Sequence, residues 1–296
     1  MGCLVVARGG PTVFEDCYGV ARADAPDDVR SVTKSVTSLL VGLALDEGFL
    51  PGVDSAMGPW LQPVATTIAD DRARITIRQL LIMTSGFDWY EGGDYALFNE
   101  WLRAPSQVDF LLARPLAFPP GSHYTYNTAA SHLLSIVIQQ ATGQRLDAWA
   151  RSRLFAPLGI GERRWLTDAQ GFCHGGIGLY LSPRDMLALG TLVLDHGRRG
   201  GVRVVGEAWL SESLAPQVPL ASYTFASGYG YLWWRGRAHG LDYVYANGYG
   251  GQFIVVVPEV RLVAVATCQW RDNANASSNW SRIMDAIVNQ LLPSVR

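Results

Sequence analysis

Ser31 and Lys34, three residues apart, are the side chains of this sequence best suited to chemistry. Among 24 lysine and arginine residues, Lys34 is the single lysine. A buried lysine can lose its proton and act as a base, whereas arginine keeps its charge in proteins. A serine hydroxyl beside a neutral amine is an activated nucleophile toward carbonyl groups. The pair therefore predicts acyl transfer, with Ser31 as the nucleophile and Lys34 as its base.

A helix predicted over residues 31–47 would hold these two side chains together. Apolar residues recur at i, i+3, i+4 and i+7 from Val36, and Gly48 follows where the helix should end. Residues i and i+3 share a helix face, and the free N–H groups at a helix start favour a developing oxyanion. A Ser-x-x-Lys match alone is weak, however. In the alternative interpretation Ser31 is a helix cap and Lys34 a solvated surface charge.

The remainder of the sequence supports no other reactive centre. It contains no Gly-x-Ser-x-Gly elbow, no phosphate-binding glycine loop, and five histidines without metal-ligand spacing. We therefore expect no metal and no cofactor. The net charge of −2 carries no signature of nucleic-acid binding, and no apolar stretch reaches the ~20 residues of a membrane helix. The expected partner is a small-molecule substrate, and the oligomeric state is left open.

The cysteines and the N-terminus bear on the cellular compartment. Cys3, Cys17, Cys173 and Cys268 are too few and too dispersed for a disulfide scaffold or a zinc site, so four thiols are expected. One pairing stays open. A three-residue loop at 9–11 would bring Cys3 and Cys17 to one face of a hairpin, whereas a two-residue loop would separate them. The first residues lack the features of a signal peptide, which predicts a cytoplasmic protein unless a leader has been removed.

Strand-like segments lie at both ends of the chain and helical segments lie between them. Strands are predicted at 3–8, 12–18, 229–234, 253–257 and 262–268, and helices at 31–47, 77–83, 101–112, 128–142, 183–196 and 278–292. The predicted fold class is α+β, with one antiparallel sheet built from both chain ends, flanked by helices, and an inserted all-helical region. Residues 1–49 and 176–296 would form the sheet domain and residues 50–175 the helical domain, with the active site between them.

A resemblance to a known family extends over nearly the whole chain. It is carried by Arg30–Leu40, Leu80–Gly86, Pro120-Gly121, Tyr126–Thr128, Gly178–Met186, Tyr229–Trp234 and Gly250–Gln252. In order and spacing these segments resemble the superfamily of serine β-lactamases and penicillin-binding proteins. The likeness is to its class C-like branch, which includes family VIII carboxylesterases and 6-aminohexanoate-dimer hydrolases. The resemblance implies a β-lactamase/transpeptidase-like fold and hydrolysis through an acylated serine.

The resemblance also implies roles for individual residues. Ser31 matches the acylated serine and Lys34 its partner, while Tyr126 matches the tyrosine of the second motif, which can pass protons between serine and leaving group. That motif usually reads Tyr-x-Asn, but here it reads Tyr126-Asn127-Thr128. Asn127 is thus a candidate substrate-binding residue, and the departure puts a penicillin-type amide contact in doubt.

The third motif of the lactam-processing relatives, Lys-Thr-Gly or His-x-Gly, is absent. Residues 247–252 take its place without a cation, so the carboxylate typical of β-lactams loses an obvious partner. The backbone N–H of Tyr249 is expected to share the oxyanion with that of Ser31. Trp89, Tyr90 and Glu91 match a loop that overhangs the pocket, where Tyr90 could bond an amide leaving group. In the alternative, both rings pack the helical region.

The function predicted from these residues is that of a serine hydrolase cleaving small esters or linear amides through a Ser31 acyl-enzyme. Two alternatives stay open. One is a β-lactamase or D,D-peptidase, against which the missing third-motif cation argues. The other is a catalytically silent binding protein, against which the complete set of Ser31, Lys34 and Tyr126 argues.

Overall fold

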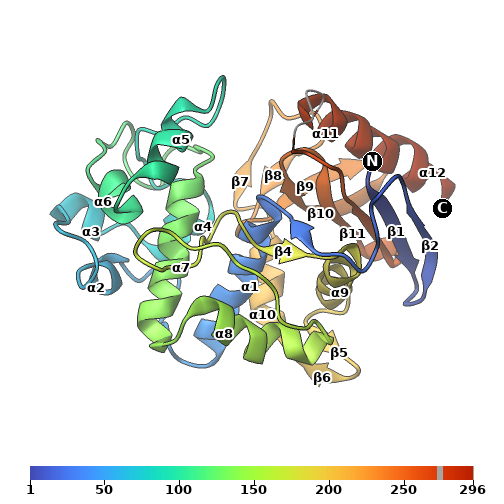
Figure 1. The fold of residues 1–296 in the computed structure, drawn as a ribbon, viewed down its shortest axis with the longest axis horizontal. Coiled ribbons are helices and arrows are strands. Elements are labelled where there is room, and N and C mark those ends of the chain that lie inside the picture. The colour runs from blue at the N-terminus through green and yellow to red at the C-terminus, as the bar shows by residue number, and fades with distance from the viewer. Residues whose placement is uncertain (272–275, 296) are drawn as a thin grey trace.

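An eight-stranded antiparallel sheet and a group of helices lie side by side in the molecule (Figure 1). The computed structural model describes residues 1–271 and 276–295. The strand order is β2-β1-β12-β11-β10-β9-β8-β7, so strands from the first residues of the chain pair with strands from its last third. Both termini consequently lie at the same side of the molecule (Figure 1). The predicted α+β class, with a sheet built from both chain ends, is confirmed.

The central strands of the sheet are buried along their whole length. The sheet consists of β1 (Cys3–Arg8), β2 (Thr12–Cys17), β7 (Val218–Pro219), β8 (Gly228–Tyr229), β9 (Trp234–Ala238), β10 (Leu241–Gly248), β11 (Gln252–Val257) and β12 (Leu262–Ala266). Every residue of β11 and β12 is buried. Their continuous apolar sequences fit this position, because a strand covered on both faces does not alternate with polar residues.

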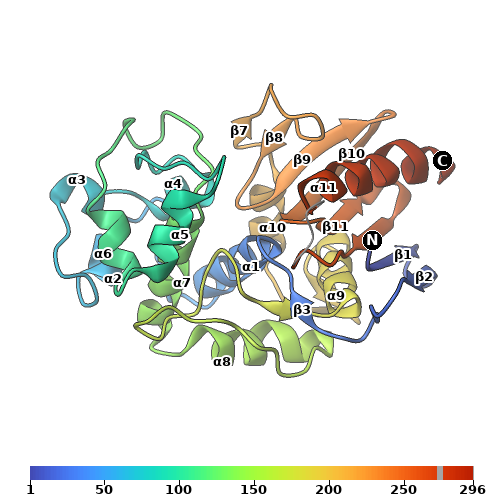
Figure 2. The same ribbon diagram turned by 45° about the horizontal axis from the view of Figure 1, so that its top comes forward.

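Helices cover both faces of this sheet. On one face lie α1 (Val32–Asp46) and α9 (Pro183–Leu194). On the other lies α11 (Ala276–Asp285), which continues as helical turns to residue 294 (Figure 2). The short helix α10 (Glu207–Leu214) packs against α1. Two small two-stranded antiparallel sheets complete this half: β3 (Asp27–Asp28) with β4 (Tyr180–Leu181), and β5 (Arg198–Arg199) with β6 (Val202–Arg203).

The helical group comes from the middle of the chain. It comprises α2 (Gly58–Leu61), α3 (Asp70–Ala73), α4 (Ile77–Leu81), α5 (Ala96–Arg103), α6 (Gln107–Leu112), α7 (Thr128–Thr142) and α8 (Leu146–Ala150). Helix α1 runs between this group and the sheet, in contact with both α7 and β10 (Figure 1). That position explains why all its residues from Val32 to Ala44 are buried, since a helix packed on every side exposes no face.

The N-terminal hairpin contains a disulfide. Three residues separate β1 from β2, and Cys3 and Cys17 lie directly opposite each other and are bonded. This is the arrangement that the three-residue loop predicted, so the expectation of four thiols is wrong for this pair. Cys173 and Cys268 are free and buried. Because β2 is an edge strand with an exposed surface, the bond ties the edge of the sheet to its neighbour.

Two predicted elements differ from the structure. The helix expected at 101–112 is two helices, α5 and α6, because Pro105 cannot continue the first and Ser106 caps the second. The strand expected at 229–234 is a tight loop between β8 and β9, with Leu232 in the left-handed region at φ 61°. The true strands β9 and β10 are not continuous apolar runs, because β9 contains arginine and glycine and β10 contains Asp242 and Asn247.

No helix in the described part of the chain is long and apolar enough to cross a membrane.

Residues 58–150 contribute only helices and their connections to the architecture, with isolated bridges but no strand of the sheet. The predicted domain boundaries at residues 49 and 176 stay a prediction.

Candidate active site

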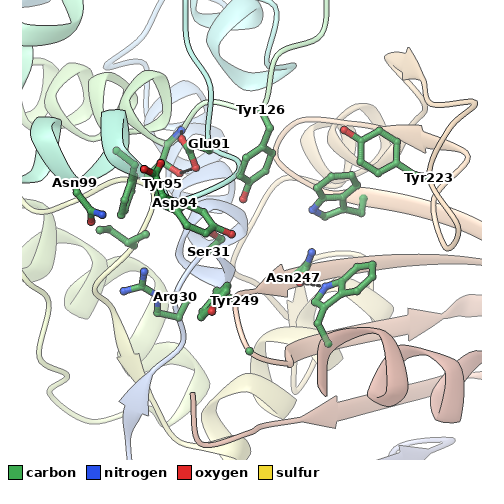
Figure 3. A pocket seen from close by; sticks show the side chains of 16 residues that line it. Arg30, Ser31, Glu91, Asp94, Tyr95, Asn99, Tyr126, Tyr223, Asn247 and Tyr249 are labelled. Carbon is green, nitrogen blue, oxygen red and sulfur yellow. Dashed lines mark hydrogen bonds between the residues drawn. The ribbon is translucent and has the colours of Figure 1, made fainter. Parts of the chain in front are cut away.

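A cavity of about 590 Å³ opens between the helical group and the sheet (Figure 3). Its lining from the helical side includes Glu91, Asp94, Tyr95, Asn99 and Thr128, and its lining from the sheet side includes Trp234, Asn247, Tyr249 and Trp280. Ser31 lies at its base (Figure 3). The volume is that of a typical small-molecule site.

Ser31 is the N-cap residue of α1, which fixes its hydroxyl at the cavity floor. The preceding residue, Arg30, adopts a left-handed backbone conformation at φ 52°. For a residue with a side chain this conformation costs about 1–3 kcal/mol, and such strain is concentrated at functional sites. The Ser31 side chain caps no backbone N–H. Instead its Oγ lies 3.0 Å from Nζ of Lys34, which excludes the interpretation of Ser31 as a simple cap.

Lys34 is buried beneath the cavity floor with 2% of its surface exposed. Its Nζ lies 2.8 Å from Thr128 Oγ1 and 3.0 Å from the carbonyl oxygen of Gly176. Burial lowers the pKa of Lys34 to about 7, while the negative charge of Glu91 works in the opposite direction and the charge of Arg30 adds to the lowering. Near neutral pH, a large fraction of the amine is therefore uncharged and able to accept a proton.

Tyr126 lies against the same amine. Its ring centroid is 4.7 Å from Lys34 Nζ, and the ring stacks on Trp234 with centroids 5.8 Å apart. Burial and the charge of Glu91 raise the pKa of Tyr126, and a hydrogen bond with Ser31 partly opposes them. The phenol is consequently protonated at neutral pH. In this state it can donate a proton to the leaving group of a carbonyl compound that Ser31 attacks.

Thr128, not Asn127, is the residue of the second motif that reaches the amine. Asn127 is buried and caps α7, its Oδ1 accepting a hydrogen bond from the N–H of Ala130 at 2.8 Å. It is not part of the cavity lining, so the structure does not place it where it was expected to bind substrate. Thr128 occupies the third position of the second motif, which usually reads Tyr-x-Asn. This position in the motif is the feature of the sequence that could have marked Thr128 as a functional residue.

Glu91 was quoted in sequence only as part of a loop, yet it is the carboxylate next to this centre. Its Oε1 accepts hydrogen bonds from the Trp89 indole at 2.7 Å and from the backbone N–H of Thr128. Its Oε2 accepts from the Thr128 hydroxyl at 2.7 Å. A continuous chain of contacts thus runs from Ser31 through Lys34 and Thr128 to Glu91. Only the fold reveals it, because the loop and α7 are 37 residues apart.

The aromatic residues of the 89–95 loop divide between core and cavity. Trp89 is buried, with its ring edge against Trp101. Tyr90 is 70% exposed and does not line the cavity. Tyr95 lines it instead, and packs edge-on against Tyr249 at 6.1 Å. Trp89 therefore packs in the helical region, as in the alternative interpretation. The structure shows no contact that would support the predicted bond between Tyr90 and an amide leaving group.

Tyr249 lies at the cavity wall, in the turn between β10 and β11. This turn follows Gly248 and takes the place of the third motif, as expected from sequence. The oxyanion role of its backbone N–H stays a prediction.

The cavity does contain a cation, Arg30, which lies outside the third-motif segment 247–252. Its guanidinium stacks on the Trp270 ring at 4.4 Å and lies 3.5 Å from the buried carboxylate of Asp28. Arg271 covers the same ring at 4.5 Å. Within residues 1–271 and 276–295 there is no group of three His, Cys, Asp or Glu side chains placed to hold a metal ion.

The fold and this centre together define a class of protein: a serine hydroxyl, a buried lysine and a tyrosine held between an antiparallel sheet and a helical group. The sequence model of the beta-lactamase family matches residues 2–287, and the chain belongs to that family.

Known proteins similar to this chain carry names of esterases, amide hydrolases and penicillin-binding proteins. A 6-aminohexanoate-dimer hydrolase from Paenarthrobacter ureafaciens is 25% identical over 84% of this chain and 68% of its own length. Esterase EstB from Burkholderia gladioli is 29% identical over 53% of this chain, and the match spans only 44% of that esterase. The structure of a penicillin-binding protein from Bacillus halodurans has the same fold, with a TM-score of 0.76, 18% identity, and coverage of 97% and 96% of the two chains.

Proposed function

We propose that this protein is a serine hydrolase that cleaves small esters or linear amides through an acyl-enzyme on Ser31. The observation that carries this proposal is the 3.0 Å contact between Ser31 Oγ and a buried amine whose pKa is lowered to about 7. A primary amine at this distance, uncharged near neutral pH, can take the serine proton as the hydroxyl attacks. No cofactor is needed for this chemistry.

The arrangement supports a two-step mechanism. Neutral Lys34 accepts the proton of Ser31 as Oγ bonds to the substrate carbonyl carbon, and the backbone N–H groups of Ser31 and Tyr249 hold the oxyanion. Tyr126 gives its proton to the leaving oxygen or nitrogen and regains one from the lysine ammonium. Water then bonds to the acyl carbon and loses a proton to the same groups; as the bond between that carbon and Ser31 Oγ breaks, the proton passes to Oγ and the acid leaves.

Esters and linear amides are supported as substrates by the names of the relatives, an esterase and a dimer hydrolase. The cavity of about 590 Å³ fits an acyl compound of modest size. The turn around Tyr249 lacks the third-motif cation, which argues against a preference for β-lactams. The presence of Arg30 in the cavity is the one observation in favour of β-lactam binding, but its guanidinium is already paired with the carboxylate of Asp28.

A substrate panel tests the proposal. Wild-type protein and Ser31→Ala should be compared on p-nitrophenyl butyrate, 6-aminohexanoate dimer, a D-amino-acid amide and the cephalosporin nitrocefin. We expect ester or linear-amide turnover that Ser31→Ala abolishes. Faster turnover of nitrocefin than of the ester would instead identify a β-lactamase. Failure of a fluorophosphonate probe to label Ser31 would identify a silent binding protein.

The domain arrangement and the compartment are also proposals. We propose that residues 1–49 and 176–296 form one domain and 50–175 the other, which limited proteolysis at the two boundaries would test.

The N-terminal sequence predicted a cytoplasmic protein, whereas a Cys3–Cys17 disulfide is more typical of oxidising compartments. The mass of the protein purified from its native cells, measured with thiols blocked, decides whether the bond exists there.

A further inference from the structure

The hydrogen bonds around Lys34 determine where its lone pair points. A neutral amine has two N–H groups and one lone pair. Nζ has three neighbours within hydrogen-bond distance: Thr128 Oγ1 at 2.8 Å, the Gly176 carbonyl oxygen at 3.0 Å and Ser31 Oγ at 3.0 Å. A carbonyl oxygen only accepts, so one N–H is committed to Gly176. The lone pair can therefore face either Thr128 or Ser31.

Glu91 decides between these two directions. An ionised carboxylate has no proton to donate, so the Thr128 hydroxyl must donate its single proton to Glu91 Oε2, 2.7 Å away. The Thr128 oxygen is then an acceptor toward Lys34 and takes the second N–H. The one remaining direction at Nζ is the lone pair, and its one remaining neighbour is the hydroxyl of Ser31.

We propose that Glu91 is a positioning residue that, through the hydroxyl of Thr128, aims the lone pair of Lys34 at Ser31. The inference rests on the proposed function and deepens it. Glu91 touches neither the serine nor, in this scheme, the reacting carbonyl. Its part is to fix the polarity of the hydrogen bond between Thr128 and Lys34. The charges that act on Lys34 are those of Glu91 and Arg30, and the phenol of Tyr126 also faces it.

Glu91→Gln tests this polarity with almost no change in size. The two N–H donors from Thr128 and Trp89 hold the remaining amide oxygen, so the new NH2 group faces the Thr128 hydroxyl and donates to it. The hydroxyl proton then turns to Nζ, and the lone pair is diverted from Ser31. We expect the rate of Ser31 labelling by a fluorophosphonate, and kcat on any substrate found, to fall about 100-fold.

Three further variants separate orientation from folding. Thr128→Val removes the hydroxyl and should behave like Glu91→Gln, while Thr128→Ser restores it and should label within a few-fold of wild type. Asp88→Asn makes the same chemical change on the same loop, at an exposed side chain bonded to Arg114, and should label at the wild-type rate. All four variants should be checked for an unchanged melting temperature.

The pH profile of labelling gives an independent readout. The charge of Glu91 raises the pKa of Lys34, so its removal lowers that pKa and moves the acid limb to lower pH. Because this shift follows from the charge alone, the aim of the lone pair is measured by the labelling rate on the plateau above the limb, which should stay about 100-fold below wild type. Equal labelling rates and limbs in wild type and Glu91→Gln would overturn the inference while leaving the proposed function intact. Absence of labelling in the wild type would overturn both.

Discussion

Two buried polar clusters lie one helical turn apart on α7 and differ in their access to the cavity. The first, named the catalytic cluster after the proposed function, consists of Ser31, Lys34, Thr128 and Glu91. The histidine cluster consists of His132, Ser135, Asp168 and His174. Lys34 and His132 are equally inaccessible to solvent, at 2% and 0% exposure. Burial of a titratable group is therefore not what separates a reactive centre from a structural one.

The histidine cluster satisfies its central ring within the protein. His132 Nε2 lies 3.0 Å from Asp168 Oδ2, and the N–H of Gly175 points at its Nδ1 from 3.4 Å. A neutral ring with its proton on Nε2 meets both partners. None of the four side chains lines the cavity. The histidine cluster also fixes the backbone of residues 173–176. Ser135 donates a hydrogen bond to the Cys173 carbonyl oxygen at 2.6 Å, in addition to the contact between Gly175 and His132.

The catalytic cluster instead ends at the Ser31 hydroxyl, at the floor of the cavity. Lys34 is bonded on two sides to Thr128 and Gly176, and its third neighbour, Ser31, is open to an incoming molecule. In the proposed mechanism, activity depends on the one bonding direction of Lys34 Nζ that is not used within the protein interior and that faces Ser31, a group that substrate can reach. The comparison predicts that changes in the catalytic cluster cost activity, and that changes in the histidine cluster cost stability.

The largest expected effect is that of Lys34→Arg. A guanidinium keeps the charge but cannot accept the Ser31 proton, so kcat/KM should fall at least about 1,000-fold. Lys34→Met, of similar length, should be as inactive and should fold. Steady-state kinetics and thermal melts of both variants measure this. Near-normal turnover of the arginine variant would remove the role assigned to the amine.

The next effect is on stability, at His132→Ala. The change leaves the buried carboxylate of Asp168 without its ring partner and opens a cavity, which should cost about 3–5 kcal/mol of unfolding free energy. Urea unfolding measures it. At temperatures where the variant is folded, kcat should stay within a few-fold of wild type. A 100-fold loss of kcat in folded protein would show that the two clusters are not separable.

Tyr126→Phe should give a smaller loss of activity. It removes the proton donor to the leaving group but leaves Ser31 and Lys34 in place, so kcat should fall about 100-fold, more for amides than for activated esters. The reason for the difference is that a p-nitrophenolate departs without protonation. Comparison of kcat on an amide and on a p-nitrophenyl ester provides the measurement. An equal loss on both substrates would argue against proton donation by the phenol.

The smallest effect is the response to pH, which should separate the two clusters again. Because the pKa of Lys34 is lowered to about 7, kcat/KM should fall about tenfold per unit as the pH drops below 7. Burial works to raise the pKa of Asp168, but the hydrogen bond from His132 and others bring it below its usual 3.8. A carboxyl with a lowered pKa stabilises the fold above that range, and the contribution is lost only as the pH falls through the folded-state value.

Activity should consequently disappear several pH units above acid unfolding. Circular dichroism and initial rates, recorded on the same samples between pH 3 and 9, would test this order. Coincident loss of rate and of structure would mean that the acid limb reports unfolding and not Lys34.

The sequence by itself determined the fold class and predicted the proposed reactive trio of Ser31, Lys34 and Tyr126. The pairing of Ser31 with Lys34 could be predicted from sequence because one helical turn brings the two side chains together, and the geometry of a helical turn is local. Tyr126 followed from a motif, and the buried strands β11 and β12 from continuous apolar runs. Strands β9 and β10 were not predicted, because the arginines and glycine of β9 and the Asp242 and Asn247 of β10 interrupt any apolar run, and only the neighbouring strands make these residues compatible with a sheet.

Tertiary structure decided the rest of the site. Asn127 and Thr128 are adjacent in sequence, yet the start of α7 directs one into a helix cap and the other toward Lys34. Glu91 acts on the same amine from a loop that sequence spacing could not place. Such contacts join segments many residues apart, and their geometry depends on how whole elements pack, which no local pattern of residues encodes.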